Sequence, residues 1–335
     1  MTNDKPRVLV TGGAGYIGSH AVLALRDKGY PVTVIDDLST GFRSAIPRDV
    51  TFCEGDIGDQ SLLARVFRDE EIGAIMHFAG SIIVPESVIA PLKYYKNNTA
   101  KSRDLIESAI DHNIKAFIFS STAATYGAPD FSPIPEDAPK SPINPYGTSK
   151  LITELMLEDV SRAHEFNYCI LRYFNVAGAD PLGRTGQSTD GATHLIKVAV
   201  EAVTGKRSHV AVFGADFDTP DGTGVRDYIH VSDLASAHVL ALEKLISNPG
   251  ENHTLNCGYG KGFSVREVLD TVDKVTNSTI DRRLQERRPG DPASLISDNR
   301  AIRATLPWVP EFASLEKIIE HAIAWELKLL ERPAQ

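Results

Sequence analysis

The stretch VLVTGGAGYIG, residues 8–18, decides the fold of this 335-residue chain. Its apolar run, residues 8–10, has the length of a buried β-strand, and a helical pattern follows the glycines over residues 19–28. Glycine permits a tight turn and lets backbone amides approach a ligand closely. A pyrophosphate at such a turn lies at the positive end of the following helix. The stretch therefore predicts a strand–turn–helix unit that binds a dinucleotide.

The glycine spacing fits two versions of this turn, Gly13-x-Gly15-x-x-Gly18 and Gly12-x-x-Gly15-x-x-Gly18. A plain tight turn also uses glycine, so the triplet alone is weak support.

The next apolar run adds context, because it ends in Asp36 and Asp37, about 18 residues past the last glycine. A carboxylate at that spacing can bind a ribose 2′-hydroxyl and repels a 2′-phosphate. We therefore expect NAD rather than NADP as the cofactor.

Short apolar runs alternate with amphipathic segments through the first half of the chain. Such runs are typical of parallel strands buried on both faces, so the sequence predicts an α/β fold with a doubly wound parallel (Rossmann) sheet. Long polar loops follow residue 174, and residues 210–213 and 253–256 could add strands. We expect an NAD-binding domain over residues 1–174 plus about 225–257, and a smaller α/β substrate-binding domain over about 175–224 plus 258–335. The early apolar runs are residues 8–10, 32–35, 74–78, 116–119 and 168–171.

Composition excludes several other classes of protein. The formal charge is −9, which disfavours nucleic acid as a partner. Three widely spaced cysteines form no disulfide framework, and the ten histidines form no close ligand cluster, so we expect no metal. The polar N-terminus and the short first apolar run predict neither a signal peptide nor a membrane span, and hence a cytoplasmic protein.

The most informative segment is residues 141–150, SPINPYGTSK. Asn144 and Pro145 are typical of a helix start, which places Tyr146 and Lys150 one turn apart on one face. A free tyrosine has a pKa of about 10 and is a poor base at neutral pH. We expect the lysine ammonium and a nicotinamide cation to lower this pKa by about 3, which corresponds to about 4 kcal/mol.

A tyrosinate of this kind can take the proton of a substrate hydroxyl while hydride leaves for NAD. Thr122 follows the apolar run 116–119, so its hydroxyl is expected in the same crevice, where it can bind the substrate oxygen or relay the proton. The competing interpretation is that Tyr146 and Lys150 form an ordinary surface pair of a helix. The glycine turn upstream favours the catalytic one.

The chain resembles the UDP-galactose (UDP-glucose) 4-epimerases, which are extended short-chain dehydrogenases. The resemblance spans nearly the entire chain, and its most specific part is GTGVRDYIHV. It rests on the glycine turn, Phe78-Ala79-Gly80, Ser120-Ser121-Thr122, Tyr126-Gly127, Pro145-Tyr146-Gly147-x-x-Lys150, LRYFN at residues 171–175 and GTGVRDYIHV at residues 222–231.

The resemblance implies an isomerase with tightly bound NAD and no net redox change. Tyr146 would remove the proton of the 4-hydroxyl, hydride would move from C4 to NAD, and the 4-keto sugar would turn and receive hydride on its other face. The residues expected at the cofactor are Gly12, Gly15, Tyr16, Ile17, Gly18, Asp36, Asp37, Asp56, Ile57, Phe78, Ala79, Gly80, Asn97, Tyr146, Lys150, Tyr173 and Phe174.

The same resemblance implies a site that grips UDP firmly and the hexose loosely. Arg226 and Arg288 could pair with the pyrophosphate through planar guanidinium groups. Arg282, Arg283 and Arg287, in contrast, are typical of a solvated basic run. The residues expected at the UDP-hexose are Thr122, Tyr146, Asn175, His194, Leu195, Ala211, Val212, Phe213, Arg226, Arg288, Asp291 and Leu295.

Three positions depart from the family pattern. Ser81-Ile82 stand where many relatives carry a lysine near the cofactor phosphate, and His194 replaces an asparagine. Leu295 aligns with a tyrosine that borders the hexose, so an N-acetylated hexose stays possible as substrate. A UDP-N-acetylglucosamine 4-epimerase is therefore the nearest alternative function.

Other activities of the same scaffold are disfavoured. A 4,6-dehydratase needs an Asp-Glu pair after the strand-end threonine, where this chain has Ala123-Ala124. An NAD-sensing protein needs no Tyr146, Lys150 and Thr122 together, and a simple alcohol dehydrogenase would release NADH.

The chain is also expected to pair with a second copy of itself. Tyr94-Tyr95 and Leu151, Ile152 and Leu155 match the faces that relatives use for a two-fold four-helix contact, although they could equally be core. We expect a homodimer.

Overall fold

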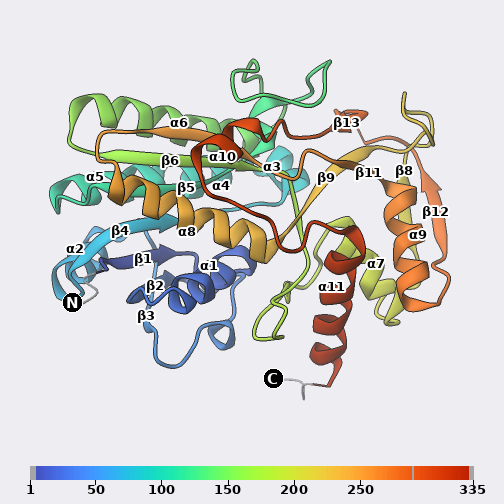
Figure 1. Ribbon diagram of the computed structural model, residues 1–335, viewed down its shortest axis with the longest axis horizontal. Coiled ribbons are helices and arrows are strands. Elements are labelled where there is room, and N and C mark those ends of the chain that lie inside the picture. The colour runs from blue at the N-terminus through green and yellow to red at the C-terminus, as the bar shows by residue number, and fades with distance from the viewer. Residues whose placement is uncertain (1–4, 289, 332–335) are drawn as a thin grey trace.

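The computed structural model describes residues 5–288 and 290–331. Its main sheet has seven parallel strands in the order β10-β6-β5-β4-β1-β2-β3 (Figure 1). The order reverses between β4 and β1, and ligands of such sheets bind at that point, beyond the carboxyl ends of the strands. These strands are β1 (Arg7–Thr11), β2 (Val32–Asp36), β3 (Thr51–Glu54), β4 (Ile72–His77), β5 (Ala116–Thr122), β6 (Asn167–Tyr173) and β10 (His253–Cys257).

The predicted doubly wound sheet is confirmed, including the late return of residues 253–256 to the sheet beside β6. Edge strand β3 was not singled out from the sequence, because its residues Thr51–Glu54 lack an apolar run. The first helix begins at Tyr16, earlier than the predicted residue 19, so it starts directly after the glycine turn.

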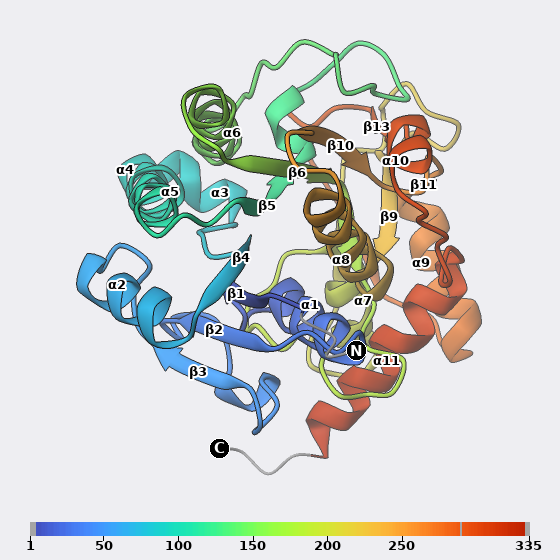
Figure 2. The same ribbon diagram turned by 60° about the vertical axis from the view of Figure 1, so that its left-hand side comes forward.

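Each face of the sheet carries its own hydrophobic core. Along β1, Val8 and Val10 point into the core under α1 (Tyr16–Asp27) and α8 (Val231–Ser247), whereas Leu9 points into the opposite core. Figure 2 shows the helices on the two sides of the sheet. The second core lies under α2 (Gln60–Asp69), α5 (Lys101–Asp111) and α6 (Pro145–Ala163). Side chains buried on both sides explain the uninterrupted apolar runs.

A smaller α/β unit continues from the large sheet. One sheet has the order β11-β9-β13, with β7 also paired to β9, and a second sheet joins β12 to β8. A third core lies among the helices α7 (Leu195–Val203), α9 (Val265–Thr276) and α11 (Leu315–Leu330). Its strands are β7 (Asn175–Ala177), β8 (Val210–Phe213), β9 (Val225–His230), β11 (Gly262–Ser264), β12 (Arg282–Gln285) and β13 (Ser294–Leu295).

Two segments depart from the expected division of the chain. Strand β9 was assigned to the NAD-binding domain with residues 225–257, but it pairs only with strands of the smaller sheet. Helix α10 (Arg300–Thr305) was assigned to the substrate-binding domain, yet Ile302 and Trp308 belong to the core under α1 and α8. The chain therefore crosses between the two units more often than the loop pattern suggested.

No helix within the described residues is long and apolar enough to cross a membrane.

Candidate active site

The glycine turn packs directly against the end of β4. Gly12 has a φ of +69°, and a Cβ there would lie 2.6 Å from the amide nitrogen of Ala79. A Cβ on Gly18 would overlap the carbonyl oxygen of Gly12, so glycine is required at both positions. Helix α1 begins after Gly15 without a side-chain cap, which leaves its amino end open to a phosphate. The turn thus fits the pyrophosphate of NAD.

Asp36 closes the other side of the same turn. Its carboxylate accepts hydrogen bonds from the Ala14 and Leu38 amides at 2.8 and 2.9 Å, and burial raises its pKa. Each carboxylate oxygen has a second lone pair, so a ribose hydroxyl can still be accepted. Asp37 is exposed and accepts from the backbone and hydroxyl of Ser39. These contacts fit Asp36, rather than Asp37, for the ribose.

Two further cofactor residues have partners within the chain. The Asp56 carboxylate pairs with Lys101 at 2.6 Å, and Ile57 is buried beside α2. Asn97 lies in the π-helix η2 (Tyr95–Ala100) and donates to Ser81 at 3.0 Å. Ser81, at the position of the missing lysine, is thus held by the asparagines of η2.

Tyr16 and Ile17, at the start of α1, face the protein. The Tyr16 hydroxyl donates to the carbonyl of Gly178 at 2.7 Å and so ties α1 to the loop after β7. Ile17 packs on the core under α8. Their side chains therefore support the turn.

The expected catalytic residues meet at the carboxyl end of β5. Helix α6 begins at Pro145, and its cap Asn144 accepts from the Gly147 amide at 2.8 Å. One turn later Lys150 donates to the carbonyl of Ser120 at 3.0 Å, while Tyr146 hydrogen-bonds to the Thr122 side chain. Both residues are buried, at 7% and 2% exposure. The structure therefore brings Thr122, Tyr146 and Lys150 together.

The chain by itself does not lower the pKa of Tyr146, which was predicted to fall with NAD bound. Burial raises the pKa of Tyr146 above its ordinary value, and only the hydrogen bond with Thr122 opposes that rise. Burial also lowers the pKa of Lys150 to about 8. The Lys150 ammonium is directed at the Ser120 carbonyl, so the chain alone holds Tyr146 as a phenol at neutral pH. The expected fall in pKa therefore requires the positive nicotinamide ring of bound NAD in addition to Lys150.

Residues on neighbouring strands complete this end of the sheet. Ser120 donates its hydroxyl to the Tyr173 hydroxyl at 3.0 Å, and Tyr173 ends β6. A Cβ on Gly80 would lie 3.8 Å from the Lys150 ammonium, so the turn after β4 reaches the catalytic lysine. The Phe78 ring lies tilted against the His238 ring of α8, with ring centroids 4.8 Å apart. The expected cofactor and catalytic residues therefore lie together at the carboxyl ends of neighbouring strands.

The residues expected at the UDP form a second cluster. Arg288 donates to the Asp291 carboxylate at 2.9 Å, and Arg226 lies 3.9 Å from the same carboxylate. The Arg288 guanidinium also lies 4.8 Å from the centre of the Phe213 ring. Strand β13 places Leu295 opposite Arg226 on β9, and Leu295 packs against a cluster that contains Phe174. Two cations and one aromatic face can thus hold a nucleoside diphosphate.

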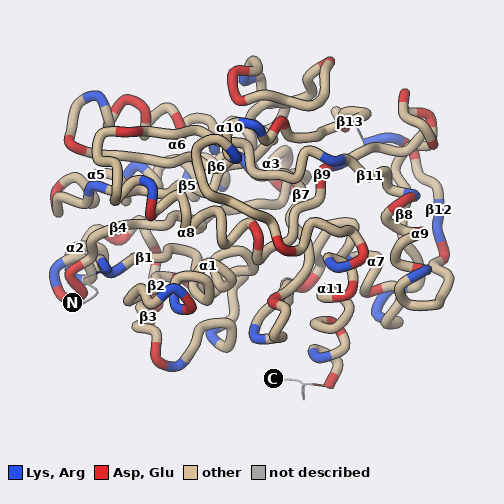
Figure 3. The backbone as a smooth tube through the Cα atoms, viewed as in Figure 1, with Lys and Arg blue, Asp and Glu red and all other residues tan. Residues whose placement is uncertain are grey.

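The other arginines of this region have local acidic partners, as the sequence suggested. Arg282 pairs with Asp270 and Asp273, Arg283 with Asp281, and Arg287 with Asp216. Figure 3 shows acidic and basic residues interspersed along this part of the chain.

The remaining substrate residues lie on three elements. Asn175 opens β7 and pairs with Tyr228 of β9, and His194 precedes Leu195 at the start of α7. Ala211 is half-buried, whereas the Val212 side chain is buried in the third core. Successive side chains of a strand point to opposite faces, so Val212 offers a ligand only its backbone.

Three positioning residues were not recognised from the sequence. Ser120 holds Lys150 and Tyr173, and Asn98 binds Ser81 and Ser149. Glu154, one turn after Lys150, pairs with Arg172 at 2.6 Å with both side chains buried. Only Glu154 had a local signal, its spacing of four from Lys150.

Comparisons with known proteins agree with this arrangement. Residues 8–258 match the model of the NAD dependent epimerase/dehydratase family. A curated UDP-glucose 4-epimerase of Azospirillum brasilense is 57% identical over 98% of this chain and 94% of its own length.

Two solved structures are also similar. A UDP-glucose 4-epimerase of Bifidobacterium longum, in complex with NAD+ and UDP, has a TM-score of 0.90 and 37% identity, covering 96% of this chain and 98% of that one. A UDP-Glc/GlcNAc 4-epimerase of Campylobacter jejuni has a TM-score of 0.85 and 46% identity, covering 96% and 99%. The glycine turn, the strand-end threonine and the tyrosine–lysine helix thus lie in a chain that belongs to the NAD dependent epimerase/dehydratase family.

Proposed function

We propose that this chain is a UDP-glucose 4-epimerase that interconverts UDP-glucose and UDP-galactose through a transient 4-keto sugar. The observation that carries the proposal is the meeting of Tyr146, Thr122 and Lys150 beside a glycine turn that fits NAD. The relatives named above support the choice of a UDP-hexose.

Tyr146 is the group that exchanges a proton with the sugar. Its hydroxyl hydrogen-bonds to Thr122, which also accepts the Ala124 amide at 3.1 Å and so has a fixed position. Thr122 can therefore hold the substrate oxygen next to Tyr146 or relay its proton. NAD supplies a reversible hydride acceptor at the sugar carbon when it is bound.

Lys150 orients the site through its contact with Ser120. It is anchored by the Ser120 carbonyl and lies 4.8 Å from the centre of the Phe119 ring. A buried cation in this position favours negative charge nearby, including a tyrosinate once it forms. Its charge state therefore matters at every step in which Tyr146 gives up its proton.

The grip on substrate is concentrated on UDP. Arg226 and Arg288 offer guanidinium groups to the diphosphate, and Phe213 offers a flat apolar surface near them. Toward the hexose, Leu295 offers an uncharged apolar side chain that packs against the cluster containing Phe174. Such a division leaves a 4-keto hexose free to turn while UDP stays bound.

The direct test is the conversion of UDP-galactose by the purified protein with no cofactor added. Formation of UDP-glucose, with NAD released on denaturation and no NADH accumulating in solution, is the expected result. Absence of conversion, with NAD bound and the protein folded, would refute the proposal. Accumulation of NADH would instead favour an alcohol dehydrogenase.

A second candidate substrate is UDP-N-acetylglucosamine, favoured by Leu295. Leucine is smaller than the tyrosine that borders the hexose in relatives, and the Campylobacter jejuni neighbour is named for both substrates. The Leu295→Tyr variant tests this idea. A loss of turnover confined to the N-acetylated sugar would support dual specificity, and no wild-type turnover of that sugar would exclude it.

We also infer a homodimer from an exposed apolar patch on α3 (Val84–Ile89) and α4 (Pro91–Tyr94). Ile89 is 85% exposed and Leu92 is 79% exposed. Leu155, expected at the contact, is exposed on neighbouring α6, whereas Tyr94 is fully buried and bonds to Ile83 and Glu86. Tyr94 is therefore core. The two patch residues and Leu155 fit a helix-on-helix contact with a second copy.

Solution mass tests the dimer. Leu92→Asp is expected to give a monomer, because it places a charge in the apolar contact. The equally exposed Val309→Asp, outside the patch, serves as the control. A monomeric wild-type protein at micromolar concentration would contradict the inference. The cytoplasmic location stays a prediction from the sequence.

A further inference from the structure

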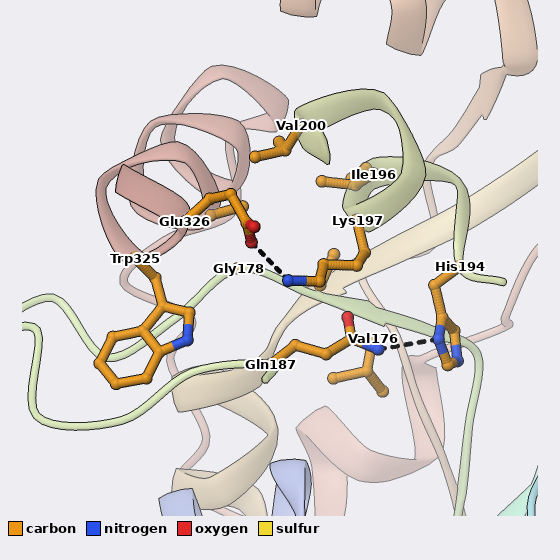
Figure 4. Close-up of a pocket in the computed structure, with 11 residues that line it drawn as sticks. Val176, Gly178, Gln187, His194, Ile196, Lys197, Val200, Trp325 and Glu326 are labelled. Atoms are coloured by element: carbon orange, nitrogen blue, oxygen red, sulfur yellow. Dashed lines mark hydrogen bonds and ion pairs between the residues drawn. The ribbon is translucent and has the colours of Figure 1, made fainter. Parts of the chain in front are cut away.

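We propose that Gln187 is a positioning residue that fixes His194 with its Nε2–H directed to an oxygen of the nucleotide-sugar. The inference rests on the proposed function and assigns a donor role to a position where this chain departs from the family pattern. His194 and Gln187 line one small cavity of about 20 Å³ (Figure 4).

The contact between the two side chains selects one form of the imidazole. The Gln187 amide nitrogen lies 3.0 Å from His194 Nδ1. An amide nitrogen can only donate, so Nδ1 must accept, and a neutral ring then carries its proton on Nε2. His194 as a residue is exposed to solvent, and we expect its Nε2–H to be open to a ligand. The pair thus presents one hydrogen-bond donor of fixed direction.

A buried ion pair supports this orientation of the amide. Lys197 and Glu326, which line the same cavity, form an ion pair with 7% and 1% of their side chains exposed. In Figure 4 the Gln187 oxygen points to the side of Lys197, and its nitrogen points to His194. A carbonyl oxygen is favoured beside an ammonium group and an NH2 group is not. The reverse orientation of the amide is therefore disfavoured.

The loop that carries Gln187 is held on both sides. The Trp325 ring of α11 lies against Gly186, where any Cβ would overlap it, and the Trp325 indole donates to Ser188 at 3.2 Å. On the other side, Thr185 hydrogen-bonds to Ser19 of α1 at 3.0 Å. Gln187 is itself 8% exposed. The amide therefore has little freedom, and His194 is set by a rigid neighbour.

The ligand atoms that suit this donor are the oxygens of a nucleotide diphosphate. His194 is the N-cap residue of α7, next to the free backbone N–H groups and positive end of that helix. A neutral N–H donor at that position can bind a phosphate oxygen and adds no charge to the cavity. Histidine can thereby replace the asparagine of relatives, provided that its tautomer is fixed.

The tautomer is measured directly by ¹H–¹⁵N NMR of the full-length protein, with His194 assigned by comparison with His194→Ala. The expected result is an unprotonated Nδ1 and a protonated Nε2 in the wild type. In Gln187→Glu, whose carboxylate can only accept, Nδ1 is expected to become protonated. A protonated Nδ1 in the wild type would overturn the proposal.

The contribution to binding is measured by calorimetry with UDP at pH 8. We expect Gln187→Ala to weaken UDP binding about tenfold. His194→Ala should weaken it at least as much, and the double variant should be no weaker than His194→Ala. Gln60→Ala, which changes a glutamine bound to Ser108 and Asp104, is the control and should bind as the wild type does.

Additive losses in the double variant, or wild-type binding by Gln187→Ala, would overturn the positioning role. Either result could occur in an active epimerase, so it would leave the proposed function intact. Failure of the wild type to bind UDP at all would overturn both proposals, and the UDP-galactose assay would then separately report the loss of the proposed function.

Discussion

Replacement of Glu154 by glutamine tests the buried support of the catalytic helix. Glu154 receives the Arg172 guanidinium through contacts of 2.6, 3.0 and 3.2 Å and the Ser121 hydroxyl at 2.5 Å. Both charged side chains are almost fully buried, at 1% and 0% exposure. The Glu154→Gln variant leaves the guanidinium charged, because arginine does not deprotonate in proteins. The variant therefore holds a buried cation without its counter-charge.

Loss of one partner of a buried ion pair costs about 3–5 kcal/mol. We expect about 3 kcal/mol, the lower end, because Arg172 keeps the Tyr126 hydroxyl at 2.9 Å and the Glu136 carbonyl at 3.1 Å as acceptors. The assay is urea unfolding at pH 7.5 with a fixed concentration of NAD, since bound ligand shifts apparent stability.

Glu107→Gln provides a matched control, since Glu107 pairs with Arg103 at 2.7 Å on the surface of α5. An exposed helical pair of this kind contributes about 0.3–0.5 kcal/mol. If Glu154→Gln destabilised the protein no more than Glu107→Gln, the assigned role of the buried pair would be wrong. A combined Glu154→Leu and Arg172→Met replacement should cost less than the single charge loss, because it removes both charges.

Three further outcomes follow from the site. Burial lowers the pKa of Lys150 to about 8 in the folded chain, against 10.5 for a free lysine. Between these two pH values the unfolded chain binds more protons than the folded chain, so the free energy of unfolding should rise with pH. Lys150→Met should remove that rise when unfolding is measured as a function of pH. Gly18→Ala should abolish retention of NAD during purification, since its Cβ would overlap the Gly12 carbonyl; retention of NAD at the wild-type level would contradict the assigned turn. Arg226→Ala should weaken UDP binding by about 10–100-fold in calorimetry, while Arg300→Ala, which removes an exposed arginine paired with Asp298, should bind normally.

Local patterns predicted the parts of the site that are close in sequence. The glycine turn and the Tyr146–Lys150 spacing each depend on one short segment, so their geometry follows from helix and turn stereochemistry alone. Thr122 was predicted because the apolar run before it ends at the same edge of the sheet. The large sheet was predicted because parallel strands that are buried on both faces appear in the sequence as uninterrupted apolar runs.

Contacts between distant segments could not be predicted in this way. Trp325 of α11 holds the loop of Gln187 through Gly186 and Ser188, and Asn98 reaches Ser149 across 51 residues. Strand β9, VRDYIH, has no regular alternation of polar and apolar residues, so it was recognised only as a motif and grouped with the NAD-binding domain, whereas it pairs with strands of the smaller sheet. Sequence spacing reveals the lysine near Tyr146 but not the burial that opposes ionisation of its hydroxyl.

The role of Tyr146 as the base is tested by the epimerisation rate of Tyr146→Phe with UDP-galactose. We predict a rate at least about 100-fold below that of the wild type, with NAD content and unfolding midpoint unchanged, because only the proton-exchanging hydroxyl is removed. Tyr168→Phe, on β6 and half-exposed, should keep the wild-type rate. A Tyr146→Phe rate within a few-fold of the wild type would contradict the assignment of Tyr146 as the base.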